Sequence, residues 1–249
     1  MTKSIYKQPP ITEAVIEIRF ASPIDESVYN KLNKKISDFY PDLKPINTYK
    51  FDVKFEGNHP NTTTTYETDY RFSSSDMSQI LILKNLAVTV SQLAPYESWE
   101  KFTSRFQRDF ALLKKHTGHR EITRIGVRYI NRVDIPNQKG EIVHEDQYVN
   151  IYPQQPENLN PVNRYAIQSQ LDLKDIKAVL TLNSAVIPSP LKDHSSIVVD
   201  QDIAKEIDVP QSAKDIVDYL EIVRTKKNSV FESCITDKAR ELFNKCLKI

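Results

Sequence analysis

Apolar and polar residues alternate along 11–20, the first strongly patterned segment of the chain. One set of positions is apolar and the other is mostly charged, with Ala14, Ile16, Ile18 and Phe20 on one face and Glu13, Glu17 and Arg19 on the other. A two-residue period is typical of a strand with one buried face. Apolar residues then recur at helical spacing up to Pro41, after Asp25 as a suitable N-cap. The pattern therefore predicts a strand followed by a helix.

Strand-like runs dominate the rest of the first half. They fall at 48–56, 62–73, 78–84 and 86–93, separated by short polar turns. An apolar stripe on a predicted helix follows and contains Trp99, Phe102, Phe106 and Phe110, with Gly118 placed to end the helix. The first half is thus predicted to have the order β-α-β4-α.

The second half begins in the same way, with a long alternating strand. Its predicted elements are this strand at 122–134, a weak helix at 141–152, strands at 164–173, 176–186 and 195–202, a helix at 215–231 and a last helix capped by Thr236. The chain is therefore predicted to be α+β, a curved antiparallel sheet with long helices packed on one face. The element order suggests two pseudo-repeats of β-α-β4-α, a first half at 1–119 and a second at 120–249, packed together as one compact unit.

This order of elements resembles the saddle fold of TATA-binding protein and the related helix-grip folds. In those folds long helices lie across one face of a curved antiparallel sheet. The resemblance implies that the first strands of the two halves, 12–20 and 122–134, lie side by side at the centre of the sheet.

Three short signatures carry a second resemblance. They are Pro-Pro-Ile-Thr-Glu-Ala-Val-Ile-Glu-Ile-Arg-Phe at 9–20, Arg-Ile-Gly-Val-Arg-Tyr-Ile-Asn-Arg at 124–132, and Phe-Glu-x-x-Ile-Thr-Asp at 231–237. Together they resemble a sporadically distributed family of uncharacterised bacterial proteins of similar length. The resemblance implies a bacterial origin and a single co-linear unit, and it supplies no activity and no catalytic residues.

Glycine is scarce, and this scarcity excludes several classes of enzyme. The chain has 4 glycines, where average usage would give about 17. Their positions allow no G-x-G-x-x-G turn, no Walker A loop and no G-x-S-x-G elbow. Rossmann dehydrogenases, P-loop NTPases, kinases and α/β-hydrolases are therefore excluded. The histidines do not lie at metal-ligand spacing, and the two cysteines fall at apolar or near-apolar helical positions, so we expect no metal site, no catalytic residue and no cofactor.

Charge and hydropathy narrow the choice of partner. Lysine and arginine number 34 against 33 aspartate and glutamate, for a net charge of +1. A dedicated binder of the phosphate backbone is strongly basic, so nucleic-acid binding is not favoured. No apolar run is long enough for a membrane span, and the N-terminus lacks a signal-peptide pattern, so we expect a cytoplasmic protein with no membrane contact.

The best candidate site is the polar side of the two central strands. Alternation places Arg124, Arg128 and Arg132 on one face of 122–134. If this strand pairs antiparallel with 12–20, the polar residues Glu13, Glu17 and Arg19 lie opposite or diagonal to the arginines. The stripe is then either a salt-bridge ladder satisfied within the sheet, or a concave platform whose guanidiniums bind a carboxylate, a phosphate or a partner's acidic residues. Tyr66 and Tyr70 would add peripheral contacts.

We interpret the chain as a non-enzymatic macromolecule-binding protein that uses this polar concave face to bind a protein partner. The family resemblance suits an accessory or defence-system component of the toxin–antitoxin kind, and a homodimer is a further arrangement left open. The alternative is a small-ligand-binding or enzymatic helix-grip protein, with a cavity under the helix that carries Trp99, Phe102, Phe106 and Phe110. A third interpretation is nucleic-acid binding across the saddle, which predicts affinity that falls steeply with salt.

Overall fold

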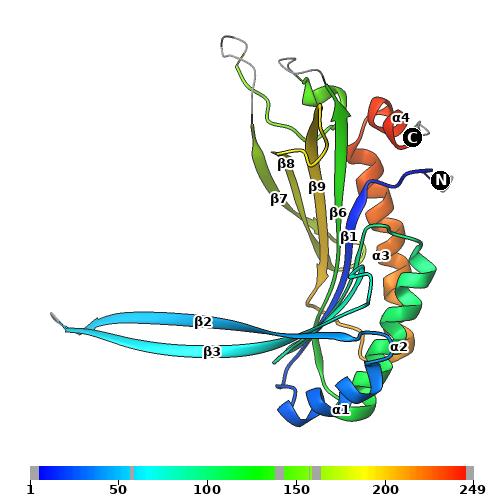
Figure 1. Ribbon diagram of the computed structural model, residues 1–249. Coiled ribbons are helices and arrows are strands. Elements are labelled where there is room, and N and C mark those ends of the chain that lie inside the picture. The colour runs from blue at the N-terminus through cyan, green and yellow to red at the C-terminus, as the bar shows by residue number, and fades with distance from the viewer. Residues whose placement is uncertain (1–5, 57–58, 138–142, 157, 159–163, 245–249) are drawn as a thin grey trace. The chain divides into compact units, whose positions relative to one another are not determined.

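A computed structural model describes residues 6–56, 59–137, 143–156, 158 and 164–244 of the protein (Figure 1). The chain divides into two compact units, each assembled from separate stretches of sequence. Unit 1 comprises Met1–Val15, Ala94–Tyr96 and Ile125–Ile249, and unit 2 comprises Ile16–Leu93 and Glu97–Arg124.

The described residues form nine strands and four α-helices. The strands are β1 (Ile11–Phe20), β2 (Asp42–Glu56), β3 (His59–Ser73), β4 (Gln79–Lys84), β5 (Ala87–Leu93), β6 (Ile122–Pro136), β7 (Ala166–Leu173), β8 (Ala178–Ile187) and β9 (His194–Lys205). The helices are α1 (Glu26–Ile36), α2 (Trp99–Thr117), α3 (Ala213–Cys234) and α4 (Asp237–Asn244), and a 3-10 turn, η1, covers Glu145–Gln147. The predicted α+β class with an antiparallel sheet is confirmed.

Strand order supports the resemblance between the two halves of the chain. Hydrogen-bonded neighbours follow the order β2-β3-β4-β5-β1-β6-β9-β8-β7. The first strand of each half therefore lies beside the last strand of the same half, β1 beside β5 and β6 beside β9. In the described residues the second half has three strands after its first, where the first half has four. The predicted adjacency of 12–20 and 122–134 is confirmed, because β1 and β6 are neighbours.

In unit 2 the helices cover one face of the strands. Paired positions of β4 and β5 bury Leu81, Leu83, Val88 and Val90. Helix α2 contacts α1 and β5 and fills this core with its aromatic stripe, since Trp99, Phe102, Phe106 and Phe110 are each at most 8% exposed. The helix begins at Ser98, whose side chain accepts a hydrogen bond from the Lys101 N–H at 3.2 Å, and ends at Gly118, where a φ of 73° favours glycine.

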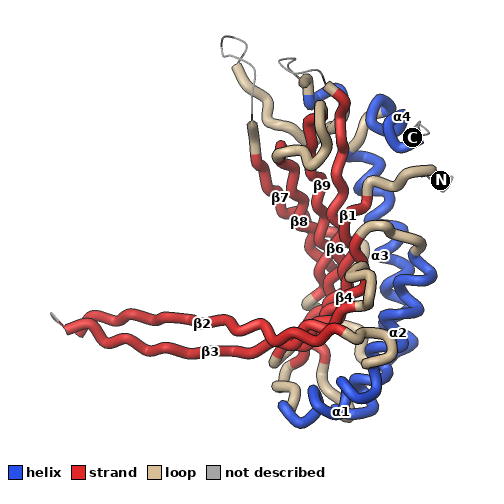
Figure 2. The backbone as a smooth tube through the Cα atoms, viewed as in Figure 1, coloured by secondary structure: helices blue, strands red, loops and turns tan. Residues whose placement is uncertain are grey.

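Strands β2 and β3 pair along their whole length, from Asp42 with Ser73 to Glu56 with His59. β2 begins at residue 42 rather than at the predicted 48, although it contains Pro45. Proline is tolerated there because β2 is an edge strand of the sheet. β4 pairs with β3 only over residues 70–73, so the rest of the hairpin is a two-stranded ribbon (Figure 2). We call residues 47–53 and 62–68 the ribbon.

In unit 1, helix α3 packs on β9 through the apolar residues Ile216, Leu220, Val223 and Phe231. The helix spans Ala213–Cys234, slightly longer than the predicted 215–231. The weak helix predicted at 141–152 is represented within the described residues by η1 alone, and 141–142 lie outside them. No helix in the described part of the chain is long and apolar enough to cross a membrane.

Candidate functional site

The alternation along β6 sorts its side chains onto two faces. Ile125, Val127, Tyr129 and Val133 are at most 1% exposed and belong to the core. Arg124, Arg128 and Arg132 occupy the other face. The division of the chain into units separates these arginines, since Arg128 and Arg132 belong to unit 1 and Arg124 belongs to unit 2.

Arg128 is held by a bidentate ion pair with Asp200 of β9. Its Nε donates to Oδ1 at 2.8 Å and its Nη2 donates to Oδ2 at 2.7 Å. Asp200 also accepts a hydrogen bond from Asn183 of β8 at 3.0 Å, and this carboxylate is 7% exposed while the arginine is 48% exposed. The pKa of Arg128 is raised by its hydrogen bonds to Asp200 and by the charges of Asp202 and Glu13. Three carboxylates therefore surround one half-exposed guanidinium.

Arg132 is held in the same manner by a carboxylate two residues away. Its Nε and Nη2 donate to the two oxygens of Asp134 at 2.8 and 3.0 Å, and the Ser196 hydroxyl donates to the same carboxylate at 2.6 Å. We call the surface formed by Glu13, Arg128, Arg132, Asp134, Asp200 and Asp202 the polar face of unit 1. Because four carboxylates accompany two guanidiniums, this face carries net negative charge.

In unit 2, Glu17 binds two arginines at once. Its Oε1 accepts from Arg124 Nη1 at 2.9 Å and from Arg19 Nε at 2.7 Å. The Arg124 side chain is 12% exposed and that of Glu17 is 16% exposed. This cluster therefore has one carboxylate between two guanidiniums, the reverse of the charge balance in unit 1.

Tyr66 and Tyr70 lie on the same face of β3 in unit 2. Tyr70 pairs with the buried Leu83, and its ring centroid is 4.6 Å from that of Tyr29 on α1. Tyr66 follows the same alternation along β3 but lies in the ribbon, where it is 72% exposed. The structure therefore places Tyr70 against α1 and Tyr66 in the ribbon.

A buried polar network joins α2 to β5 and to Tyr40, which lies between α1 and β2 in unit 2. The Tyr40 hydroxyl donates to Asp109 Oδ2 at 2.5 Å and accepts from Arg105 Nη1 at 3.1 Å. Arg105 also donates to the Ser91 carbonyl at 2.7 Å, and Arg108 donates to Asp109 Oδ1 at 2.8 Å. Burial, with the charge of Asp109, raises the pKa of Tyr40. The network fixes the aromatic helix that the alternative interpretation places over a ligand cavity.

Unit 1 contains a second polar cluster, between α3 and the strands. Lys227 of α3 is 8% exposed, and its Nζ lies 3.8 Å from the centroid of the Tyr129 ring. The Tyr129 hydroxyl is 2.9 Å from that of Tyr96. Gln201, which pairs with Tyr129 across β6 and β9, is 2% exposed and its Oε1 has no hydrogen-bond partner in the described chain. We call these four residues the Lys227 cluster.

Lys227 lacks a carboxylate partner among the described residues, and its Nζ donates to Asn228 Oδ1 at 2.7 Å. Burial, reinforced by the charge of Arg224, lowers the pKa of Lys227 to about 7. The amine is therefore close to half neutral at physiological pH. Buried lysines of this kind act as nucleophiles, bases or binding groups in other proteins.

The sequence interpretation missed Lys227, although the chain carries a signal for it. Buried positions of α3 recur at three- and four-residue steps, Leu220, Val223, Lys227, Phe231 and Cys234. Lys227 thus continues the apolar stripe of an amphipathic helix, where a lysine is seldom found. Its neighbour Lys226 is the ordinary case, since it pairs with Asp175 at 2.5 Å and is 28% exposed.

Comparisons with known proteins leave the chain without an assigned family. No family model matches it, and no curated protein matches it. Among solved structures it is similar to DynU16, a protein of the dynemicin biosynthetic locus, at 9% identity, with 77% of this chain and 87% of that chain covered and a TM-score of 0.20. A similarity at this TM-score carries no argument about function.

Proposed function

We propose that the protein is a non-enzymatic protein-binding module whose polar face in unit 1 engages a basic segment of its partner. The observation that carries the proposal is the excess of carboxylates around Arg128 and Arg132. Complementary charge across an interface speeds encounter and selects the partner. A lysine- or arginine-rich segment complements this face.

The proposal differs from the sequence interpretation in the sign of the partner's charge. Both guanidiniums of the unit 1 face already hold carboxylates of the same unit, so an incoming anion would compete with Asp134 and Asp200. The same charge balance argues against a nucleic-acid ligand on this face. A place in a bacterial accessory or defence system belongs to the proposal as well and rests on the sequence resemblance alone.

The test uses peptides of known charge as probes. We expect fluorescein-labelled deca-lysine to bind the protein at about 50 mM salt and to dissociate as salt is raised, because screening weakens exposed charge interactions. Labelled deca-glutamate and a short DNA duplex should not bind. Fluorescence anisotropy measures each interaction.

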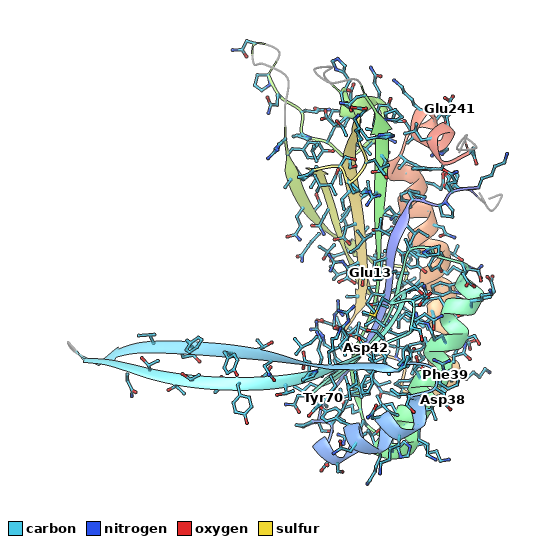
Figure 3. All side chains as sticks on the ribbon, in the orientation of Figure 1. Glu13, Asp38, Phe39, Asp42, Tyr70 and Glu241 are labelled. Carbon is cyan, nitrogen blue, oxygen red and sulfur yellow. The ribbon has the colours of Figure 1, made fainter. Side chains whose placement is uncertain are left out.

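A matched pair of variants locates the binding surface. Glu13→Gln/Asp202→Asn removes two negative charges from the polar face and should weaken deca-lysine binding about three- to tenfold. Glu241→Gln/Asp208→Asn removes the same charge elsewhere in unit 1 and should leave binding unchanged. Glu241 lies on α4 (Figure 3), and Asp208 follows β9. Equal losses in the two variants, or preferential binding of deca-glutamate, would contradict the proposal.

A second candidate function is the binding of a small apolar carboxylate beneath α3. It is favoured by one observation, a buried amine that has no carboxylate partner in the described chain. A carboxylate ligand would supply the counter-charge that Lys227 lacks and would favour its protonated form. The candidate moves the predicted ligand site from the aromatic helix of unit 2 to the Lys227 cluster of unit 1.

Proton uptake tests this candidate. At pH 8 Lys227 is mostly neutral, so binding of octanoate should take up close to one proton, measurable by calorimetry in buffers of different ionisation enthalpy. Lys227→Met should abolish the uptake, and Lys226→Met should retain it. Absence of binding heat, or equal uptake in Lys227→Met, rules the candidate out.

A further inference from the structure

The ribbon of unit 2 carries an apolar stripe on one of its two faces. Cross-strand pairing places Tyr49 opposite Tyr66, Phe51 opposite Thr64 and Val53 opposite Thr62. The rings of Tyr49 and Tyr66 are 6.3 Å apart, a normal separation for a cross-strand aromatic pair. We call the face formed by these six residues the stripe.

The stripe continues the face that is buried in the rest of unit 2. Tyr66 lies four residues before Tyr70, on the same side of β3, and Tyr70 contacts Tyr29 of α1. Along the ribbon no described helix of unit 2 covers this side, and Tyr49, Phe51, Val53 and Tyr66 are 59%, 68%, 53% and 72% exposed. The apolar face of the unit 2 strands therefore continues along the ribbon, where no described helix of unit 2 packs against it.

An isolated two-stranded ribbon is marginally stable in water, and contiguous exposed apolar surface marks an interaction site. The stripe and the next pair toward the rest of unit 2, Asn47 with Thr68, contain no charged residue. In a chain with 27% charged residues, a run of eight uncharged side chains on one face is the composition of an interface core. The stripe has no charged group that could pair with a phosphate backbone or with a charged peptide.

We propose that the stripe is a self-association surface, on which the ribbon of a second copy packs face to face. A two-fold axis brings the same surface of both copies together, so an uncharged apolar stripe is complementary to itself. The proposal concerns unit 2 and does not depend on the polar face of unit 1.

The size of the stripe agrees with a weak dimer. An aromatic side chain offers roughly 150–250 Å² of contact area, so at their exposed fractions the three rings offer about 400 Å². Val53 and the threonines bring this to about 500 Å² for one copy, or about 1,000 Å² for the pair. This total is at the lower limit for a specific interface, so we expect a dissociation constant on the order of micromolar.

Adjacent threonines on opposite faces provide a matched test. Thr64 lies in the stripe opposite Phe51, and Thr63 lies on the other face opposite Asp52; both are exposed. Thr64→Lys would place an amine in the dimer interface and should raise the dissociation constant about tenfold or more. Thr63→Lys makes the same substitution one residue away and should dimerise like the wild type.

Sedimentation equilibrium between about 1 and 200 µM measures the association across the expected range. Equal melting temperatures of the two lysine variants would show that neither change unfolds the protein. A wild type that stays monomeric over this range overturns the proposal, as does equal weakening by the two variants. Binding of wild-type monomer to phosphatidylcholine vesicles, lost in Thr64→Lys, would assign the stripe to a lipid surface instead and also overturn it.

Discussion

Asp109→Asn should lower the free energy of unfolding by about 3–5 kcal/mol, the usual loss when one partner of a buried ion pair is removed. Asp109 is 1% exposed and accepts from Tyr40 and Arg108, and Arg105 is 6% exposed beside the same tyrosine. Asparagine carries no negative charge and has one side-chain acceptor oxygen, so it cannot replace the interactions of Asp109 with both Tyr40 and Arg108. The arginine charges would then stay partly buried without compensation.

Urea unfolding followed by circular dichroism measures this effect. Asp38→Asn makes the same change on an exposed residue of unit 2 and should shift stability by less than about 0.5 kcal/mol. Tyr40→Phe should cost about 1–2 kcal/mol, because it removes hydrogen bonds but leaves the charges paired. The double variant should lose less than the two single losses added together. If Asp109→Asn lowered the free energy of unfolding by no more than Asp38→Asn, the buried polar network would contribute little to stability.

Lys227→Met should change stability in the opposite direction and raise the free energy of unfolding by about 2–4 kcal/mol at pH 7. The pKa of Lys227 is lowered from 10.5 to about 7 in the folded protein, and a tenfold change in a protonation equilibrium corresponds to about 1.4 kcal/mol. Methionine keeps the volume of the side chain and needs no hydration. Lys226→Met is the control and should have little effect.

The pH dependence of this effect has a definite sign. Between pH 7 and 10.5 the unfolded chain binds a proton at this lysine and the folded protein does not. The contribution of Lys227 to stability is therefore most unfavourable at pH 7 and below, and it vanishes as the pH rises through 10.5. The gain from Lys227→Met should shrink accordingly when urea unfolding is repeated at pH values from about 7 to about 10. If Lys227→Met raised the free energy of unfolding by the same amount at every pH, the lowered pKa of Lys227 would be contradicted.

Element order was predictable because alternation and helical spacing are local signals. The strand at 11–20, the aromatic helix from Trp99 and the four strands of the second half all follow from such patterns. The beginning of β2 did not, because Pro45 argues against a strand unless the strand is known to lie at an edge. Edge position is a property of the assembled sheet.

The candidate site was predictable only in part, for the same reason. Two-residue alternation placed Arg124, Arg128 and Arg132 on one face of β6. Their partners depend on the registry between strands far apart in sequence, as the pairing of β6 with β9 brings Asp200 to Arg128. The charge balance of the face, and with it the predicted chemistry of the partner, could not be read from one strand.

The interleaved composition of the units has a consequence for synthesis on the ribosome. Unit 2 ends at Arg124, so all of its residues are translated before the last segment of unit 1, from Ile125 onward. At typical elongation rates, roughly ten seconds pass between translation of the first half of β1 and translation of the unit 1 segment that begins at Ile125. The nascent chain can therefore complete unit 2 first, while the first half of β1 stays available to chaperones.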